Sequence, residues 1–183
     1  MEVLSAHFER VSTCPNAILP IRKTEGAAGY DFFISEDIII PSHLSKLIEF
    51  LPGDNESMTL EQVAAFTKAH GLKPTLVPTG VKAYLEPDTY LELTVRSSCP
   101  LKYLLLLANG VGVIDRDYYN NEDNEGAIYF QLLNLFPYPI KLQKGECIGQ
   151  GIIKPFLKTA DDAATGIRTG GFGSTDGSTT TGA

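Results

Sequence analysis

Short apolar segments separated by turn-forming pairs occupy much of this chain, and they constrain its fold more than any other feature. The segment at residues 90–95 alternates apolar and polar side chains, as a half-buried strand should. Pairs such as Pro-Gly, Pro-Asp, Asn-Gly and Lys-Gly separate many of the segments and favour turns. Many short strands with regular turns are typical of a β sandwich, jelly roll or barrel. The expected strands are residues 37–41, 75–78, 80–85, 90–95, 104–107, 127–133 and 148–153.

The most apolar run, at residues 103–108, is followed by a segment whose residue types suit a small-ligand pocket. A run of this kind bounded by turn residues predicts a buried strand. An Asn-Gly turn signal follows it, and residues 110–118 then carry two glycines, two aspartates and a tyrosine. Glycines let backbone approach a ligand closely. The alternative is an ordinary hairpin whose acids face water.

Residues 59–70 interrupt the strand pattern and predict a helix. Thr59 and Gln62 fit a capping box at its start, and Gly71 fits a C-terminal cap. We expect residues 42–73 to form an insertion between two strands that covers an edge or patch of the fold. Binding of a protein partner is the alternative role. The apolar side chains that would share one face of the helix are Leu60, Val63 and Phe66.

The composition changes at residue 159, which divides the chain into a domain at 1–158 and an arm at 159–183. The arm is rich in Ala, Asp, Gly, Ser and Thr, a composition typical of a flexible segment. A solvated tail has little use for Arg168 and Phe172. We therefore expect the arm to fold over a ligand.

Charge excludes some classes of partner. The 183 residues suffice for one domain with a core, but the net charge is −7. A general nucleic-acid or membrane-surface binder needs a basic face. Residues 1–10 show no targeting pattern, and no stretch approaches the roughly 18 apolar residues of a membrane span. We expect neither nucleic acid nor membrane as a partner.

The cysteines indicate a reducing compartment. They are three in number, far apart in sequence, and form no CxxC pair. Such thiols are typical of a cytoplasmic protein. No zinc site is expected, because the histidines show no ligand spacing with them. The residues concerned are Cys14, Cys99, Cys147, His7, His43 and His70.

Five segments, taken in order, resemble the five motifs of the homotrimeric dUTPase family. Each motif alone is a weak signal, but five in the right order are highly specific. The resemblance runs from about residue 27 to residue 177, apart from the helical insertion. The segments are residues 27–31, 95–98, 110–118, 145–150 and 168–177.

The resemblance implies a mainly β protomer, a distorted jelly-roll barrel with one inserted helix and a flexible C-terminal arm. It implies a homotrimer with three active sites, each assembled from more than one subunit and closed by the arm. The implied reaction converts dUTP and water into dUMP and pyrophosphate with Mg²⁺. This hydrolysis keeps uracil out of DNA and supplies dUMP for thymidylate synthesis.

The family pattern also implies roles in catalysis. Asp115 matches the carboxylate that acts as general base on the water attacking the α-phosphorus. Asp31 matches an acid that orders the water around the metal without touching the substrate. Mg²⁺ keeps water ligands readily, so we expect phosphate oxygens and water, and no direct protein ligand, to hold it.

Phosphate binding is implied for two groups of residues. An Arg offers a planar fork and a Ser an O–H donor, which suit phosphate oxygens. The motif positions for this role are Arg96, Ser97, Ser98 and Gln150 in the domain, and Arg168, Gly173, Ser174 and Thr175 in the arm.

Nucleoside recognition is implied for the third motif and its neighbours. The amide of Asn109 matches the uracil edge, and Tyr118 would pack under deoxyribose and leave no room for a 2′-hydroxyl. Phe172 would stack on uracil. Further contacts are expected from Gly112, Val113, Ile114 and the backbone near Ile128 and Tyr129.

Some features depart from the family pattern or leave alternatives open. Residues 118–126 form a longer, more acidic turn than is usual, and Val95 replaces a common proline. One alternative is a bifunctional dCTP deaminase and dUTPase of the same fold, with Glu92 as a candidate for its key glutamate. The other is a regulatory protein of this fold that binds a partner through residues 42–73.

Overall fold

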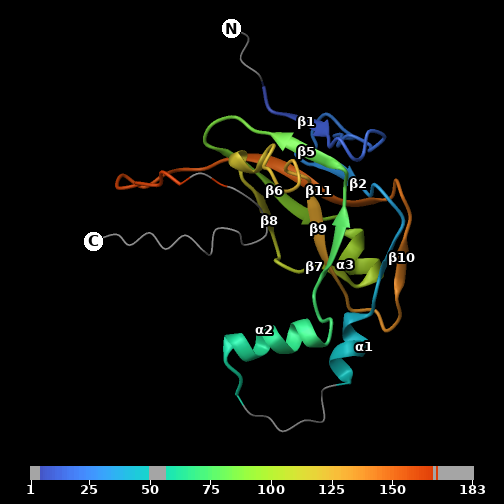
Figure 1. Cartoon of the computed structure of the whole chain (residues 1–183). Coiled ribbons are helices and arrows are strands. Elements are labelled where there is room, and N and C mark those ends of the chain that lie inside the picture. Colours follow the sequence, from blue (N-terminus) through green and yellow to red (C-terminus); the bar gives the residue numbers. More distant parts are fainter. Residues whose placement is uncertain (1–4, 50–56, 167, 169–183) are drawn as a thin grey trace.

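The computed structural model, which describes residues 5–49, 57–166 and 168, is built mainly from short antiparallel strands (Figure 1). Within those residues, one sheet has the order β2-β11-β6-β8 and another β4-β9-β7, and two pairs, β1-β5 and β10-β3, complete the set. The mainly β jelly-roll class is therefore confirmed. The strands are β1 (His7–Arg10), β2 (Tyr30–Phe33), β3 (Ile38–Ile40), β4 (Thr75–Pro78), β5 (Val81–Tyr84), β6 (Thr89–Val95), β7 (Leu105–Leu107), β8 (Gly112–Ile114), β9 (Tyr129–Asn134), β10 (Ile140–Leu142) and β11 (Cys147–Pro155).

Strand β11 is the centre of the larger sheet and lies between β2 and β6. At its middle, Gln150 faces Asp31 on one side and Thr94 on the other. Its glycines are required by packing. A Cβ on Gly151 would lie 2.7 Å from the Phe32 ring, and a Cβ on Gly149 would overlap the Phe130 ring. The backbone of β11 therefore lies directly on the aromatic core.

The core fills the space between the two larger sheets. Strand β6 alternates as its sequence predicts: Leu91 and Leu93 are buried, and the other residues of the strand are less so. Phe32 and Phe130 meet edge to face, with ring centroids 5.8 Å apart. The largest fully buried side chains are Phe32, Phe130, Ile34, Ile40, Leu85, Leu91, Leu93, Leu105, Ile128, Leu132, His43 and Val77.

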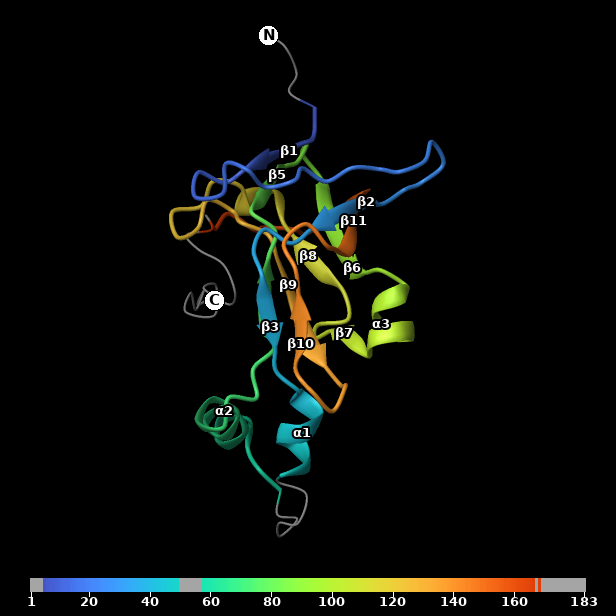
Figure 2. The ribbon, with the colours of Figure 1, turned by 90° about the vertical axis from the view of Figure 1, so that its right-hand side faces the viewer.

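Two helices, α1 (His43–Ile48) and α2 (Leu60–Ala69), lie at the end of the strands opposite β1 and β5 (Figures 1 and 2). The predicted helix is α2, and its capping box between Thr59 and Gln62 is present. Helix α1 was not predicted. Its buried His43 attaches the insertion, because Nδ1 accepts from the Asn134 N–H and Nε2 then donates to the Lys73 carbonyl, each at 3.0 Å.

The apolar residues of α2 do not pack into the core of this chain. Leu60 is 88% exposed and Val63 44%, and no residue of α2 is buried. Lys46 of α1 contacts the chain just after the end of α2, where its Nζ donates to the Gly71 carbonyl at 2.8 Å. No helix in the described part of the chain is long and apolar enough to cross a membrane.

The seven predicted strands are all present, but the prediction that residues 103–108 form a buried strand was wrong in part. Tyr103 ends a short helix, α3 (Ser98–Tyr103), and Leu104 adopts a positive φ of 52°. The strand therefore starts at Leu105, and Leu106 is 36% exposed. The run at 103–108 is a half-buried strand after a helix and not a strand buried on both faces.

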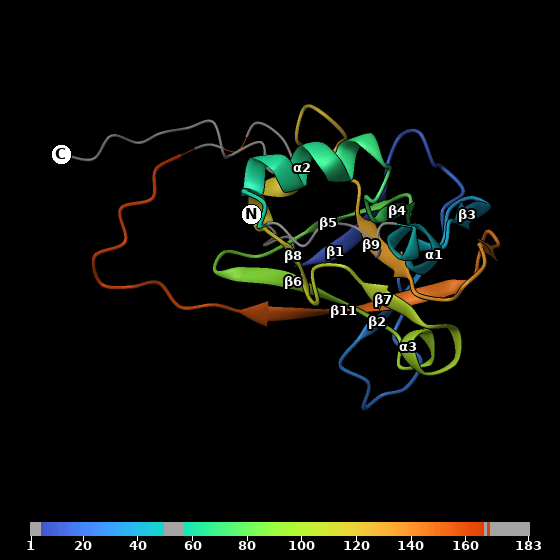
Figure 3. The ribbon, with the colours of Figure 1, turned by 90° about the horizontal axis from the view of Figure 1, so that it is seen from below.

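Residues 156–166 leave the end of β11 as an exposed segment (Figure 3). Arg168 then lies back against the domain. Most of the predicted arm, residues 167 and 169–183, lies outside the described residues. The structure records Cys14, Cys99 and Cys147 as free thiols.

Candidate active site

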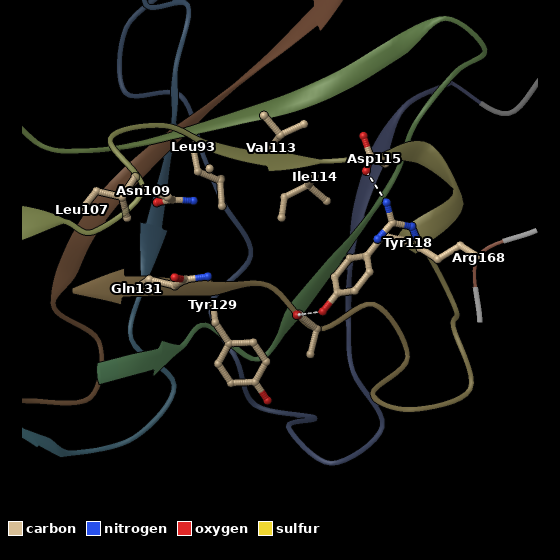
Figure 4. A pocket seen from close by; sticks show the side chains of 12 residues that line it. Leu93, Leu107, Asn109, Val113, Ile114, Asp115, Tyr118, Tyr129, Gln131 and Arg168 are labelled. Atoms are coloured by element: carbon tan, nitrogen blue, oxygen red, sulfur yellow. Dashed lines mark hydrogen bonds and ion pairs between the residues drawn. The ribbon is translucent and has the colours of Figure 1, made fainter. Parts of the chain in front are cut away.

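A pocket of about 180 Å³ lies between strands β6, β8 and β9 and the short helix η1 (Arg116–Tyr118). The amides of Asn109 and Gln131 lie at one end, and Asp115, Tyr118 and Arg168 lie at the other (Figure 4). The pocket therefore has an amide end and a charged end, joined by an apolar wall. Its lining residues are Leu93, Leu107, Asn109, Gly112, Val113, Ile114, Asp115, Tyr118, Ala127, Tyr129, Gln131 and Arg168.

Two glycines shape the strand that enters this pocket. Gly110 has a φ of +69° and donates to the Leu107 carbonyl at 3.0 Å, which closes the predicted Asn-Gly turn. Gly112 faces Leu93 across the sheet, and a Cβ there would lie 3.1 Å from the Leu93 Cβ. The turn and the close strand pairing together place Asp115 at the end of β8.

Arg168 binds both aspartates of the third motif. Its Nε donates to Asp117 at 2.9 Å, and its terminal nitrogen forms an ion pair with Asp115. The Arg168 guanidinium also lies 6.0 Å from the centre of the Tyr118 ring. The structure thus brings the arm arginine to the predicted catalytic carboxylate, while the two aspartate side chains stay about half exposed.

Tyr118 is held in the wall of the pocket by hydrogen bonds on its hydroxyl. The residue is 6% exposed. Its O–H donates to the Ala127 carbonyl at 3.0 Å, and Asn124 Nδ2 donates to the same oxygen at 2.8 Å. Burial raises the pKa of Tyr118, so the phenol stays neutral. The two hydrogen bonds hold the ring as a fixed surface in the pocket wall.

Gln131 faces the same space as Asn109 and was not predicted (Figure 4). It stands on β9 between the buried Phe130 and Leu132, so it points away from the core. This alternation is the signal that could have identified it. Glu92, the candidate for a deaminase, is outside the pocket lining and binds Lys154 at 2.6 Å and Tyr90 at 3.0 Å.

Most of the other residues predicted to contact the nucleoside line the pocket, but one does not. Val113, Ile114 and Tyr129 line the pocket, as does Gly112. Ile128 does not, because its side chain is fully buried and its backbone N–H donates to the Val81 carbonyl at 2.9 Å. Of the two residues, Tyr129 is therefore the one that lines the pocket.

The remaining motifs gather elsewhere on the chain. Arg96 and Ser98 line a separate cavity of about 350 Å³ together with Cys147. Asp31 and Gln150 face each other on β2 and β11, and the side chain of Gln150 lies against Gly29, where a Cβ would be 2.7 Å from its Oε1. Neither these residues nor Ser97 line the pocket of Asp115.

The predicted arm contacts Phe172, Gly173, Ser174 and Thr175 lie outside the described residues. Within the part that is described, no three His, Cys, Asp or Glu side chains come together as a metal site. The nearby acids are engaged by cations, Asp115 and Asp117 by Arg168, and Asp31 by Lys23 at 3.3 Å.

The chain was compared with known families and proteins. The dUTPase family model matches residues 62–176. The deoxyuridine 5′-triphosphate nucleotidohydrolase of Lactococcus lactis is 38% identical over 172 residues, which covers 92% of this chain and 95% of that protein. The enzyme of the same name from Helicobacter pylori J99 is 27% identical and covers 88% and 90% of the two chains.

Solved structures show the same likeness. The crystal structure of dUTPase from Streptococcus mutans has a TM-score of 0.66 and 37% identity, and it covers 84% of this chain and 98% of its own. A mutant dUTPase from phage phi11 of S. aureus, described as revealing the coordination of a structural Mg(II) ion, has a TM-score of 0.60. It covers 88% of this chain and 97% of its own at 16% identity, which supports the fold alone.

Proposed function

This chain belongs to the dUTPase family and is a dUTP diphosphatase, and we propose that it cleaves dUTP in the pocket of Asp115. The products are dUMP and pyrophosphate. One observation carries this choice of site. A single pocket holds two amides at one end and a carboxylate beside a buried tyrosine at the other. In the cell, this reaction would keep uracil out of DNA and supply dUMP for thymidylate synthesis.

We propose that uracil binds at the amide end. Asn109 presents one acceptor and two donors, which suits the neighbouring oxygen and N–H of a uracil edge. Gln131 lies at the same end and adds a second adaptable amide. The backbone at Tyr129 would complete the contact, and Leu93 and Ile114 supply apolar surface for the ring.

We propose that deoxyribose packs on Tyr118. The phenol is buried, neutral and fixed by two hydrogen bonds. A fixed ring rejects an added hydroxyl by overlap, whereas a mobile ring could move aside. Ribonucleotides would therefore be excluded at the sugar and not at the base.

We propose that Asp115 is the general base. A carboxylate at hydrogen-bond distance from a water can take its proton as the water attacks phosphorus. In the structure Arg168 occupies one of the Asp115 oxygens. Binding of a triphosphate gives the guanidinium a more highly charged partner, so Arg168 would turn to the phosphates and leave Asp115 to the water.

The phosphate-binding residues support a trimer with shared sites. Arg96, Ser97, Ser98 and Gln150 are absent from the pocket of their own chain. The triphosphate needs several cations, and among the described residues Arg168 is the one cation that lines this pocket. We propose that a neighbouring copy supplies them, with three copies forming a closed ring of three sites.

We propose that Mg²⁺ enters with the triphosphate, held by phosphate oxygens and water. When bound, it neutralises phosphate charge and helps to align the α-phosphorus. Asp31, on the other cluster, would order water near it. The three free thiols suit the reducing cytoplasm, to which we assign the protein.

The test is pyrophosphate release by the purified protein with Mg²⁺, given dUTP, dCTP, dTTP and UTP in parallel. Release from dUTP alone is expected, and within that result the amides would distinguish uracil from cytosine and Tyr118 would exclude ribose. Release from dCTP would favour the bifunctional deaminase. Release from none would favour a regulatory role, for which the exposed Leu60 and Val63 of α2 offer an apolar surface.

A further inference from the structure

The long turn at residues 119–126 is bound to the hydroxyl of Tyr118 by one side chain, Asn124. Asn124 Nδ2 donates to the phenol oxygen at 2.8 Å, and its Oδ1 accepts from the Gly126 N–H at 3.0 Å. The same Oδ1 accepts from Asn121 Nδ2 at 2.8 Å. One amide therefore joins the turn to the wall of the pocket.

The hydrogen-bond partners fix which way round the Asn124 amide stands. The backbone N–H of Gly126 is a donor in any protonation state, so the atom that faces it must be the oxygen. The nitrogen then faces Tyr118 and donates to it. The phenol oxygen accepts this bond, and its own proton goes to the Ala127 carbonyl. The donor and the acceptor of both hydrogen bonds at the Tyr118 hydroxyl are thus assigned.

The turn that carries Asn124 is itself held together by hydrogen bonds of Asn121. The Asn121 side chain is 8% exposed, accepts from the N–H groups of Asp123 and Asn124, and donates to the Tyr118 carbonyl at 2.9 Å. Gly126 has a φ of +81°, and a Cβ there would lie 2.5 Å from that same carbonyl. The turn therefore closes tightly against the backbone of the tyrosine it positions.

The far side of the turn is anchored independently of Tyr118. Glu125 accepts from the backbone N–H of Ser12 at 3.2 Å and from its hydroxyl, and it lies 3.4 Å from Lys82 Nζ. Glu125 has a positive φ of 60°, which these bonds help to hold. The anchor at Ser12 stabilises the turn without touching the pocket.

We propose that Asn124 is a positioning residue that fixes the Tyr118 ring and thereby sets the discrimination between 2′-deoxyribose and ribose. The inference rests on the proposed function, because it takes Tyr118 as the surface under the sugar. Steric exclusion of a hydroxyl works only when the excluding ring cannot move. With Asn124 removed, one of the two bonds to the phenol is lost and the ring gains freedom.

The test compares kcat/KM for dUTP and for UTP in the wild type, Asn124→Ala, Tyr118→Phe and the double variant. Tyr118→Phe keeps the bonds that Asn124 makes inside the turn and loses only those to the hydroxyl. We expect each single variant to lower the ratio of dUTP to UTP about five- to tenfold, the scale of one intramolecular hydrogen bond. The loss should come from faster UTP cleavage, and kcat for dUTP should change less.

The double variant decides whether Asn124 acts through the phenol. If it does, Asn124→Ala has no further effect once the hydroxyl is gone, so the double variant should have the same dUTP to UTP ratio as Tyr118→Phe. Multiplied losses would overturn the proposal, as would a wild-type ratio in Tyr118→Phe. The second result can be obtained even if Asn124→Ala does not fold.

Ser12→Ala is the matched control. It weakens the anchor of the same turn at Glu125 but keeps the bond from Asn124 to Tyr118. It should lower the melting temperature and leave the nucleotide ratio unchanged. A ratio that falls equally in Ser12→Ala would show a general effect of turn stability and would overturn the proposal. A wild type that cleaves UTP as well as dUTP would instead overturn the proposed role of Tyr118.

Discussion

At the scale of single residues, the two aspartates that share Arg168 have different surroundings. Asp115 lines the pocket beside Tyr118 as well as the neighbouring surface depression, whereas Asp117 lines only the depression. Both carry the same charge and bind the same guanidinium. The two aspartates therefore differ in position and not in charge, so a substitution at Asp117 is the control for the same substitution at Asp115.

Asp115→Asn should bind dUTP and lose most turnover. The amide keeps the shape of the side chain but cannot take a proton from water, so kcat should fall roughly 10²- to 10⁴-fold. Binding measured by calorimetry should persist. Asp117→Asn makes the same change in charge and loosens the same arginine. Because it leaves the proposed base at Asp115 intact, it should cost far less turnover. Equal losses in the two variants would show that Arg168 placement, and not a base at Asp115, is responsible.

Sequence reasoning identified some residues of the pocket and missed others for physical reasons. Asn109, Asp115 and Tyr118 lie in one short stretch of sequence that runs from a turn through β8 into η1, so a local motif captures them. Gln131 comes from the strand opposite, and only the pairing of β9 with β7 brings it near Asn109. Asn124 acts through a hydrogen bond of defined geometry, which composition does not encode.

At the scale of elements, strand β11 couples the core to the fourth motif. Gly149 belongs to the predicted fourth motif at residues 145–150, and the structure gives it a packing role. Gly149 lies against the Phe130 ring, and a Cβ added to it would lie 2.7 Å from the Thr94 carbonyl oxygen. Side chains at this position would push β11 away from β6 and move Gln150 with it.

Gly149→Ala should therefore destabilise the fold by about 1–3 kcal/mol, the usual range for an overpacked core. Urea unfolding followed by far-UV circular dichroism would measure it. Gly26→Ala is the matched control, because an added Cβ at Gly26 meets nothing within 4 Å. A midpoint for Gly149→Ala equal to that of Gly26→Ala would show that β11 adjusts without cost.

The elements that were predicted and those that were missed differ in how much of the signal for them lies in their own sequence. Strands such as β6 and β9 carry enough alternating residues to be recognised alone. The missed strands β1 and β2 have four residues each and β8 and β10 three, and all four are defined by their partners across the sheet. Helix α1 depends on His43, whose two hydrogen bonds reach residues 30 and 91 positions away.

At the scale of the whole molecule, the motifs fall into two groups. One surrounds Asp115 and Asn109, and the other contains Arg96, Asp31 and Gln150. A triphosphate bound through both groups requires that they meet, and they do not line one pocket within this chain. Assembly of copies is the arrangement that we propose to unite them. Sequence motifs name both groups but carry no information on which chain supplies each.

Co-expression of two inactive variants tests this arrangement. Asp115→Asn and Arg96→Ala each damage one group. In a random trimer with shared sites, about a quarter of the sites combine an intact Asp115 from one chain with an intact Arg96 from another. Pyrophosphate release should therefore return to roughly a quarter of the wild-type level.

The control pair is Asp115→Asn with Asn109→Ala, because both residues line the same pocket of one chain. No chain in that mixture has an intact pocket, so activity should stay at the level of the single variants. If the first pair also stayed inactive while forming mixed trimers, the phosphate group and the base would have to come from the same chain. The separation of the two clusters would then have to be closed by movement within one subunit and not by its neighbours.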